Sequence, residues 1–401
     1  IMKNLENIYS KYKENTFSFE SEYLQKLKKN LIKDFDLDPK VLKNNESIKN
    51  FDSRIFNNFD YNPINKNNLF KVFNSNDQSI VNIIDNKDLF LKKIKKYENS
   101  FKDDYLVNLN TIFHNSGIYL EIEDNTNEKY IIENIASKDM TIFSKNFFQI
   151  KPNSNVMIIE KFNNEQKSNI NLVNYFEIEK NSSVIHLVSQ EIKENANLQF
   201  TNYINCHEKS YYKQIIYNSS ESSIRNHSYA NLLEKESKSE LYGVFFGKSD
   251  QVIDNKTVIN HYAPNCVSNQ KYKGVLVDNA KASYLSKTYV DKVAQKTEAY
   301  QLNKGILLSE DSNYHSKPEL KIYADDVKCS HGSTIGPFDQ DILFYFRSRG
   351  ISKTHATALL IKSFFSDIIE SANEGWWDTD EKFFSTLVKD SIDAWLQKNN
   401  Y

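Results

Sequence analysis

A short phrase, a polar turn followed by a run of alternating apolar and polar residues, recurs along the middle of the chain and limits the folds open to it. The alternation begins at Gly117 with GIYLEIE and is typical of β-strands that bury one face. The phrase returns as PNSNVMII (152–159), KNSSVIHLV (180–188), ENANLQF (194–200), ESSIRNHSY (221–229) and NAKASYLSKTYV (279–290). Because no long helical pattern separates these strands and hairpin dipeptides are few, stacked solenoid coils are favoured. A parallel β-helix is the leading interpretation, with a two-sheet antiparallel sandwich as the alternative.

The turns between these strands contain almost no glycine. The chain has 9 Gly and 6 Pro in 401 residues, whereas Asn and Lys are abundant. Left-handed backbone conformations are most readily adopted by Gly and, after it, by Asn and Asp. We therefore expect Asn and Asp at the left-handed positions of the turns.

Helical patterns flank the β-region on both sides. Before it, SEYLQKLKKNLIKDF and KDDYLVNLNTIFHN place apolar residues three and four positions apart, with Ser21 as an N-cap. After Gly336, helical spacing resumes, with Gly350 as a C-cap and Ser352 as the next N-cap. The expected domains are an N-terminal helical domain at 1–115, a β-core at 116–336 and a C-terminal helical domain at 337–401.

The helix expected after Ser352 has unusually wide apolar coverage. Its apolar residues are Leu359, Leu360, Ile361, Phe364, Phe365, Ile368 and Ile369. More than one stripe of the helix is therefore apolar, which indicates burial on two sides. Either the helix packs between neighbours of its own chain, or one side binds a partner.

Composition excludes several classes of partner. With 51 basic and 53 acidic residues, the net charge of −2 produces no strong field for nucleic acid or for an anionic membrane. No window reaches the roughly 18 apolar residues of a membrane-spanning helix, and the start of the chain lacks the apolar core of a signal peptide. The three cysteines are widely spaced and form no CxxC pair. A reducing, cytoplasmic location is expected.

The segment GVFFGKSD, starting at Gly243, resembles a phosphate-binding loop only superficially. It is one residue shorter than the Gly-x-x-x-x-Gly-Lys-Ser/Thr motif, its interior is bulky, and no helical pattern follows. We expect no nucleotide to bind to this chain.

The segment YADDVKCSHGSTIG, at 323–336, concentrates residues that are rare elsewhere in the chain. If it is a strand, Asp325, Val327, Cys329 and His331 share one face, and the Cα atoms of Cys329 and His331 lie roughly 7 Å apart. A thiolate and an imidazole are suitable ligands for iron or for an iron-sulfur cluster, but two ligands do not complete a site. A buried cysteine beside a capping histidine is the structural alternative, and no hydrolase motif supports a Cys-His nucleophile.

The other two cysteines have less chemical context. Cys206 precedes His207, and adjacent strand residues face opposite ways, so the two side chains are not expected to share a site. Cys266 is interpreted as a small buried side chain.

Three longer runs, VINHYAPNCVSNQKYKGVL, AQKTEAYQLNKGILLSED and PELKIYADDVKCSHGSTIGPFDQDILFYFRSRGI, carry a family resemblance. They closely resemble the SufB/SufD family of the SUF iron-sulfur cluster assembly machinery, and CSHGSTIG with LFYFRSRGI is similar to its SufD branch. The match is dense from about Thr257 to Ile351 and weak over the N-terminal region.

This resemblance implies a mainly β fold, a right-handed parallel β-helix flanked by N-terminal and C-terminal helical domains. It further implies that the chain pairs with SufB through the β-helices and docks the ATPase SufC through the C-terminal helices. The corresponding partner-binding residues are Leu359, Leu360, Phe364, Phe365 and Ile368. The chain would be a scaffold and not an enzyme, because ATP hydrolysis belongs to SufC.

The cysteine and histidine of the family's CSH motif correspond to Cys329 and His331. The resemblance implies that they contribute to a nascent iron-sulfur cluster, held transiently and shared with SufB at the interface. Two alternatives stay open: a homodimeric or SufB-like scaffold, and a β-helix carbohydrate-active enzyme.

Overall fold

The computed structural model describes residues 5–10, 21–33, 70–74, 80–82, 86–97, 104–114, 116–165, 167–372 and 381–398. Within these residues, two sheets of nine strands each dominate the fold, and from β3 onward successive strands alternate between the sheets. Sheet A consists, in spatial order, of β1 (Phe70–Asn74), β4 (Asn127–Ala136), β6 (Asn155–Asn164), β8 (Ser183–Gln190), β10 (Tyr211–Asn218), β12 (Lys238–Gly247), β14 (Val267–Leu276), β16 (Thr297–Leu307) and β18 (Val327–Gly336). Sheet B consists of β2 (Ile80–Asn82), β3 (Ile118–Ile122), β5 (Thr141–Ile150), β7 (Asn169–Ile178), β9 (Asn197–Cys206), β11 (Ile224–Leu232), β13 (Val252–His261), β15 (Lys281–Val290) and β17 (Asn313–Ile322).

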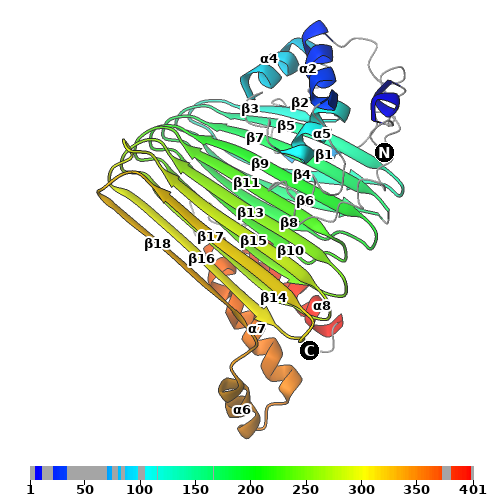
Figure 1. Ribbon diagram of the computed structural model, residues 1–401, viewed down its shortest axis with the longest axis vertical. Coiled ribbons are helices and arrows are strands. Elements are labelled where there is room, and N and C mark those ends of the chain that lie inside the picture. The colour runs from blue at the N-terminus through cyan, green and yellow to red at the C-terminus, as the bar shows by residue number, and fades with distance from the viewer. Residues whose placement is uncertain are drawn as a thin grey trace.

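The strands from β3 to β18 pair in parallel and form a solenoid whose coils stack from the N-terminal to the C-terminal end (Figure 1). Asn146, Asn174 and Asn202 occupy the same position in three successive coils, 28 residues apart, and each amide donates to the next across 3.0 Å. Such in-register ladders satisfy polar side chains inside the stack. The predicted parallel β-helix is confirmed, and the antiparallel sandwich is wrong.

The corners of the coils contain the left-handed residues that the sequence predicts. Asn125, Asn153 and Asn181 recur at one corner with φ between 57° and 59°. Lys209 follows at the same corner with φ of 56°, although a side chain with a Cβ is disfavoured there. The corner geometry is therefore imposed by the stacking and tolerates residues other than Asn and Asp.

Apolar side chains that point inward fill the solenoid and repeat from coil to coil. Phe148 and Phe176, for example, stack at 4.5 Å between ring centroids inside the sheet pair. Outside, on sheet B, Tyr175, Tyr203 and Tyr229 form a similar row at 5.3 and 5.1 Å. Repetition of one side-chain type at one register position lets neighbouring coils pack with the same geometry.

The N-terminal helices α2 (Glu22–Lys33), α4 (Lys87–Tyr97) and α5 (Tyr105–Phe113) pack on the first coils of sheet B (Figure 1). Ser21 caps α2 as predicted, because its Oγ accepts a hydrogen bond from the backbone of Leu24 at 3.3 Å. This region is not only helical, however. β1 and β2 pair antiparallel with β4 and β3 and close the N-terminal ends of both sheets.

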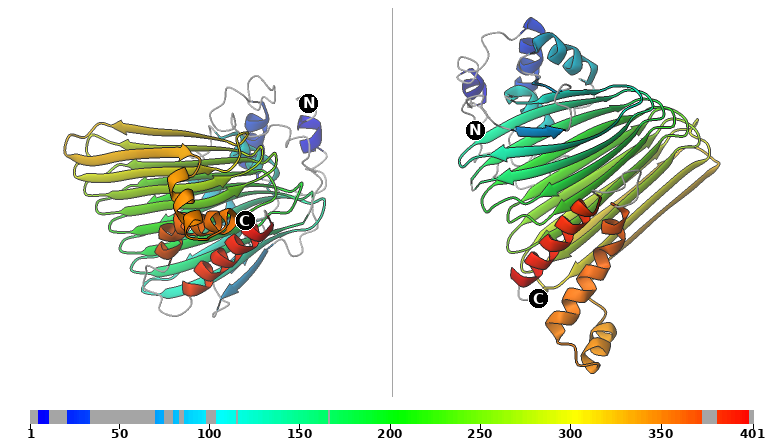
Figure 2. Two further views of the ribbon diagram at one scale, coloured as in Figure 1. Left: turned by 90° about the horizontal axis from the view of Figure 1, so that it is seen from below. Right: turned by 180° about the vertical axis from the view of Figure 1, so that it is seen from behind.

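The C-terminal helices are α6 (Gln340–Ser348), α7 (Lys353–Ser371) and α8 (Glu381–Lys398). Figure 2 shows α7 and α8 lying on the outer face of sheet A, while α6 extends beyond the solenoid. Gly350 ends the α6 segment with φ of 83°, and Ser352 Oγ accepts from the backbone of His355 at 3.2 Å, so both predicted caps are confirmed. Within the described residues, no helix combines the length and the apolar character needed to cross a membrane.

Candidate functional site

The last coil of the solenoid is open on one side. Among the described strands, β18 pairs only with β16 and β17 only with β15, so each sheet ends in an edge strand. Elsewhere in the stack, the next coil covers the inward-facing side chains, but no described strand covers those of the last coil. The inward-facing residues of β18 are therefore accessible at the C-terminal end of the solenoid.

Cys329 and His331 are two of these residues. Cys329 lies opposite Ala299 and His331 opposite Gln301, and both partners face the solenoid interior. Cys329 is half-buried against a small apolar cluster that includes Ala294 and Ala324, whereas His331 is exposed. The backbone register places both side chains on the inward face.

The strand around this motif is shorter than predicted. It begins at Val327, and Asp325 lies in the preceding bend, where it is exposed. The expectation that Asp325 shares the face of Cys329 is therefore wrong, because the chain is still turning the corner of the coil at that residue. Among the described residues, no group of three or more His, Cys, Asp or Glu side chains could hold a metal ion. Within that part of the chain, Cys329 and His331 amount to an incomplete set of ligands.

The surroundings of Cys329 keep its thiol protonated near neutral pH. Burial raises the pKa of the thiol, and a hydrogen bond with the backbone of Ala299 opposes this only in part. Because iron binds the thiolate, binding of iron or of a cluster at Cys329 must release a proton. A neighbouring base or a metal from outside the chain is needed to drive that step.

The remaining cysteines are structural. Cys206 is fully buried, and burial raises the pKa of its thiol to about 12. His207 faces away from it, as predicted, with Nε2 at 2.7 Å from Glu177 Oε1. Cys266 is the small buried residue that the sequence predicts, with its Sγ at 3.3 Å from Ser237 Oγ.

The segment that resembles a phosphate loop lies mostly within β12. Gly243 faces the interior of the solenoid, and a Cβ at this position would lie 2.3 Å from Cε1 of Tyr272 in the next coil. Glycine is needed here for the close approach of an aromatic ring, not for the approach of a phosphate. The geometry of a nucleotide-binding loop is absent from this segment.

The C-terminal helices expose a different apolar surface from the one expected. Leu359 is 38% exposed, and Leu360 and Phe364 are half-buried. Phe365 and Ile368 are fully buried, and Phe365 packs on Phe246 of β12 at 5.1 Å between ring centroids. Their prediction as partner contacts is wrong, because this side of α7 is covered by the solenoid of the same chain.

Three exposed apolar residues of α6 were not singled out from the sequence. Ile342, Phe344 and Tyr345 are 44%, 72% and 57% exposed. With Leu359 they form what we call the α6 surface. The run ILFYF in the sequence could have predicted this surface, since a helix that is apolar on several sides is either covered by its own chain or binds a partner.

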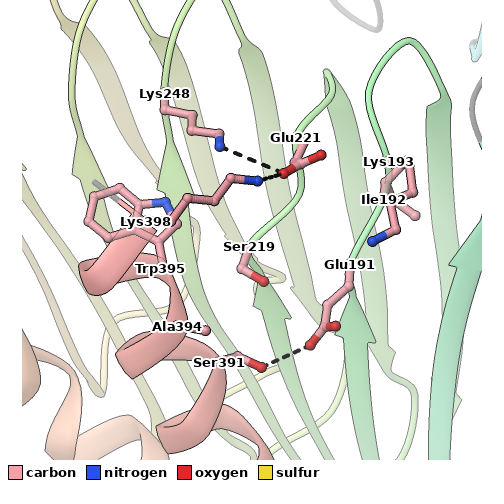
Figure 3. A pocket seen from close by; sticks show the side chains of 10 residues that line it. All are labelled: Glu191, Ile192, Lys193, Ser219, Glu221, Lys248, Ser391, Ala394, Trp395 and Lys398. Atoms are coloured by element: carbon pink, nitrogen blue, oxygen red, sulfur yellow. Dashed lines mark hydrogen bonds and ion pairs between the residues drawn. The ribbon is translucent and has the colours of Figure 1, made fainter. Parts of the chain in front are cut away.

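A pocket of about 230 Å³ lies where α8 meets the corners of the coils (Figure 3). On one side Lys398 pairs with Glu221, and Lys248 lies 3.8 Å from the same carboxylate. On the other side Ser391 Oγ donates to Glu191 at 2.8 Å. These contacts attach α8 to the solenoid, and the charged groups that line the pocket are largely matched by one another.

Comparison with known proteins identifies a family whose model matches most of the solenoid. The family described as "SUF system FeS cluster assembly, SufBD core domain" matches residues 132–364, more than half of the chain. This match covers the solenoid from β4 onward, including Cys329 and His331, and extends into α7.

Individual relatives match over shorter segments. A SufBD family iron-sulfur cluster assembly protein of Synechocystis is 38% identical over 137 residues, which are 34% of this chain and 30% of the relative. The iron-sulfur cluster assembly protein SufD of Escherichia coli is 31% identical over 151 residues, 38% of this chain and 36% of the relative. A chloroplastic protein of Arabidopsis thaliana is 35% identical over 149 residues, 36% of this chain and 31% of the relative. The matched segments thus span about a third of the length of these relatives. On the match to the core domain, the chain belongs to the SufBD family of the SUF iron-sulfur cluster assembly system.

Proposed function

We propose that the chain is a scaffold subunit that assembles iron-sulfur clusters at a site shared with a second β-solenoid of the SufB type. The observation that carries this proposal is the open last coil, which exposes Cys329 and His331 on its inward face. These two side chains supply part of a ligand set, and a facing solenoid would supply the rest.

The backbone of the last coil supports pairing with another solenoid. β17 and β18 each span 10 residues, and each has one edge of N–H and C=O groups that pairs with no other described strand. Edge strands of this length normally pair with another strand or are protected from doing so. Pairing along both edges would bring the partner's side chains over Cys329 and His331.

The cluster is the cargo of this site and not a resident cofactor. The Cys329 thiol would lose its proton on binding iron, and the His331 imidazole would act as a nitrogen ligand or accept that proton. This chain would bind, orient and release the nascent cluster without binding a nucleotide.

The α6 surface is the proposed dock for the ATPase SufC. It combines exposed aromatic and aliphatic side chains of α6 with Leu359 of α7, and α6 projects from the solenoid (Figure 1). α7 connects it to sheet A, where Lys273 Nζ lies 2.6 Å from both Asp367 Oδ1 and the carbonyl oxygen of Phe364. Movement of a docked ATPase would therefore be transmitted to β14, two strands from β18.

The test is co-expression with SufB and SufC, followed by cluster reconstitution and visible absorbance. Cys329→Ala and His331→Ala are expected to reduce the cluster yield while the mixed complex still forms. Ser330→Ala is the matched control, because Ser330 lies between them on the outward face of β18. Unchanged cluster yield in both variants, with an intact complex, would exclude the site. A stable self-dimer that binds SufC but rejects SufB would instead favour the homodimeric scaffold.

A further inference from the structure

A row of polar side chains inside the solenoid ends at His331. Gln270 of β14, Gln301 of β16 and His331 of β18 occupy one register position in three successive coils of sheet A. Gln270 is fully buried, and Gln301 is 4% exposed. Because neighbouring strands of a sheet are about 4.8 Å apart, each residue of the row lies beside the next.

A hydroxyl group of the opposite sheet holds each glutamine of this row. Thr257 Oγ1 donates to Gln270 Oε1 at 2.5 Å, and Ser286 Oγ donates to Gln301 Oε1 at 2.9 Å. Thr257 and Ser286 are themselves neighbours in register, and the next residue of their row is Pro318 in the last coil. Proline has no side-chain hydroxyl, so the histidine of the last coil lacks the contact that both glutamines make.

The neighbours of the Gln301 amide fix its orientation. Its Nε2 donates to Thr288 Oγ1 at 2.8 Å and to the backbone oxygen of Glu319 at 3.2 Å. A carbonyl oxygen can only accept hydrogen bonds, so the amide nitrogen, and not the amide oxygen, must face Glu319. Both N–H groups are then used. Among the described residues, Oε1 accepts only from Ser286, which leaves this oxygen one further acceptor position.

We propose that Gln301 is a positioning residue of the candidate site. When the His331 imidazole binds a metal ion through one ring nitrogen, the N–H of the other ring nitrogen donates to Gln301 Oε1. A histidine that ligates a metal normally donates its second N–H to an oxygen, which fixes the orientation and the tautomer of the ring. Gln301 is next to His331 in register and offers such an oxygen, whereas the side chain of Pro318 offers none.

Other acceptors at the open end are fewer than its polar residues suggest. Asn303 Oδ1 already accepts from the Tyr314 hydroxyl, and Asn303 Nδ2 donates to Ser333 Oγ at 3.4 Å. Ser316 Oγ has no hydrogen-bond partner within the described part of the chain, so it is the competing acceptor for the imidazole. A role of Gln301 in cluster assembly rests on the proposed function, but the contact itself requires only a metal ion.

The test measures binding of Co²⁺ to the full chain from the absorbance of the cobalt–thiolate bond, which Cys329→Ala should abolish. Gln301→Leu is expected to bind Co²⁺ about 10- to 100-fold more weakly, the usual effect of removing the acceptor behind a ligating histidine. The double variant Gln301→Leu, His331→Ala should bind about as weakly as His331→Ala alone, because Gln301 acts through the imidazole. A purely structural role of Gln301 would instead make the two losses add.

Gln270→Leu is the matched control. Gln270 makes the same kinds of contact as Gln301, with a hydroxyl on Oε1 and with Thr288 and a backbone oxygen on Nε2, but it lies one coil further from His331. This variant and Ser316→Ala should bind Co²⁺ like the unmodified chain. Circular dichroism establishes that the variants are folded, and Gln301→Met, which is unbranched and of similar length, replaces Gln301→Leu if the latter is not.

Three results would overturn the assignment of Gln301. The first is equal affinity of Gln301→Leu and the unmodified chain for Co²⁺. The second is a loss of the same size in Gln270→Leu or in Ser316→Ala. The third is the absence of any cobalt–thiolate absorbance that depends on Cys329 and His331. Because Co²⁺ binding uses the single chain, its outcome is separate from the cluster yield of the complex with SufB and SufC, which tests the proposed function.

Discussion

Asp104 is expected to be one of the most sensitive residues for the stability of the chain. It caps α5, with Oδ1 accepting from the backbone of Leu106 at 3.0 Å and of Val107 at 3.3 Å. Its Oδ2 pairs with the guanidinium of Arg225, which is fully buried on sheet B and also donates to Thr201 at 3.1 Å. One carboxylate thus joins the N-terminal helices to the solenoid.

Replacing Asp104 by Ala should lower the free energy of unfolding by about 4 to 6 kcal/mol. Loss of one partner of a buried ion pair costs about 3–5 kcal/mol, because the other charge is left buried, and loss of an N-cap costs about 1 kcal/mol. Asp104→Asn keeps a capping oxygen and should cost less than Asp104→Ala. Asp104→Leu combined with Arg225→Met should recover part of the loss, since neither charge of this pair then remains buried without the other.

Urea unfolding followed by circular dichroism measures these differences. Asp104→Ala should lose more stability than Asp104→Asn. The double variant Asp104→Leu, Arg225→Met should lose much less stability than the sum of the losses of its two single variants. A loss below about 1 kcal/mol for Asp104→Ala would refute the reasoning, since that is the value of an exposed ion pair.

The pH dependence follows from the same contacts. Burial opposes ionisation of Asp104, but Arg225 and His227 outweigh it and hold the pKa of the carboxyl below its usual value. A depressed folded-state pKa contributes stability that is present above the unfolded pKa of about 3.9 and is lost as the pH falls through the folded value. As the pH falls below about 4, stability should therefore decline less steeply in Asp104→Asn than in the unmodified chain, because the substitution removes the proton that the unfolded state binds more readily than the folded state.

Three further outcomes are expected. Phe365→Ala should lower the free energy of unfolding in urea by about 3–5 kcal/mol, because Phe365 is fully buried. Phe344→Ser should leave the free energy of unfolding nearly unchanged and weaken binding of SufC in a pull-down, because Phe344 is exposed. The reverse pattern would contradict the assignment of the two surfaces. Lys209→Gly should stabilise the fold by about 0.5–1 kcal/mol and so raise the melting temperature, because Lys209 has φ of 56°, a conformation that glycine adopts without strain. A lower melting temperature would show that the corner is unstrained. A hydrogen bond to Glu177 raises the pKa of His207 to about 9. Protonated His207 therefore stabilises the fold below its unfolded pKa of about 6.5, and this stabilisation should be lost as the pH rises to about 9. His207→Gln should reduce this loss, and an NMR titration that places the pKa of His207 near 6.5 would contradict the prediction.

Local pattern predicted much of the solenoid because its coils are themselves local. Alternation of apolar and polar residues identifies a strand wherever it occurs, and a repeat of turn and strand can bury its apolar face only against its own neighbours. The same argument predicted left-handed Asn at the corners, which Asn125 and Asn153 confirm. It did not predict β1 and β2, because short strands at the end of a sheet depend on the strand that receives them.

Of the candidate site, too, the sequence predicted the local arrangement but not what surrounds it. Alternation along one strand was enough to place Cys329 and His331 on a common face. It could not show that this face is the uncovered end of the stack, since that depends on there being no described strand beyond β18. The wide apolar coverage of α7 was visible in sequence, but which of its residues the solenoid covers was not, so Phe365 and Ile368 were assigned to the wrong surface.

The sequence by itself therefore determined the parallel β-helix, its helical flanks and the pairing of a thiol with an imidazole on one strand. The tertiary structure alone decided which faces are covered and which charges are buried together. Asp104 and Arg225 are 121 residues apart, and nothing in either local sequence points to the other. Periodicity along the chain reports only which side of an element is apolar, whereas burial depends on what the rest of the chain brings to that side.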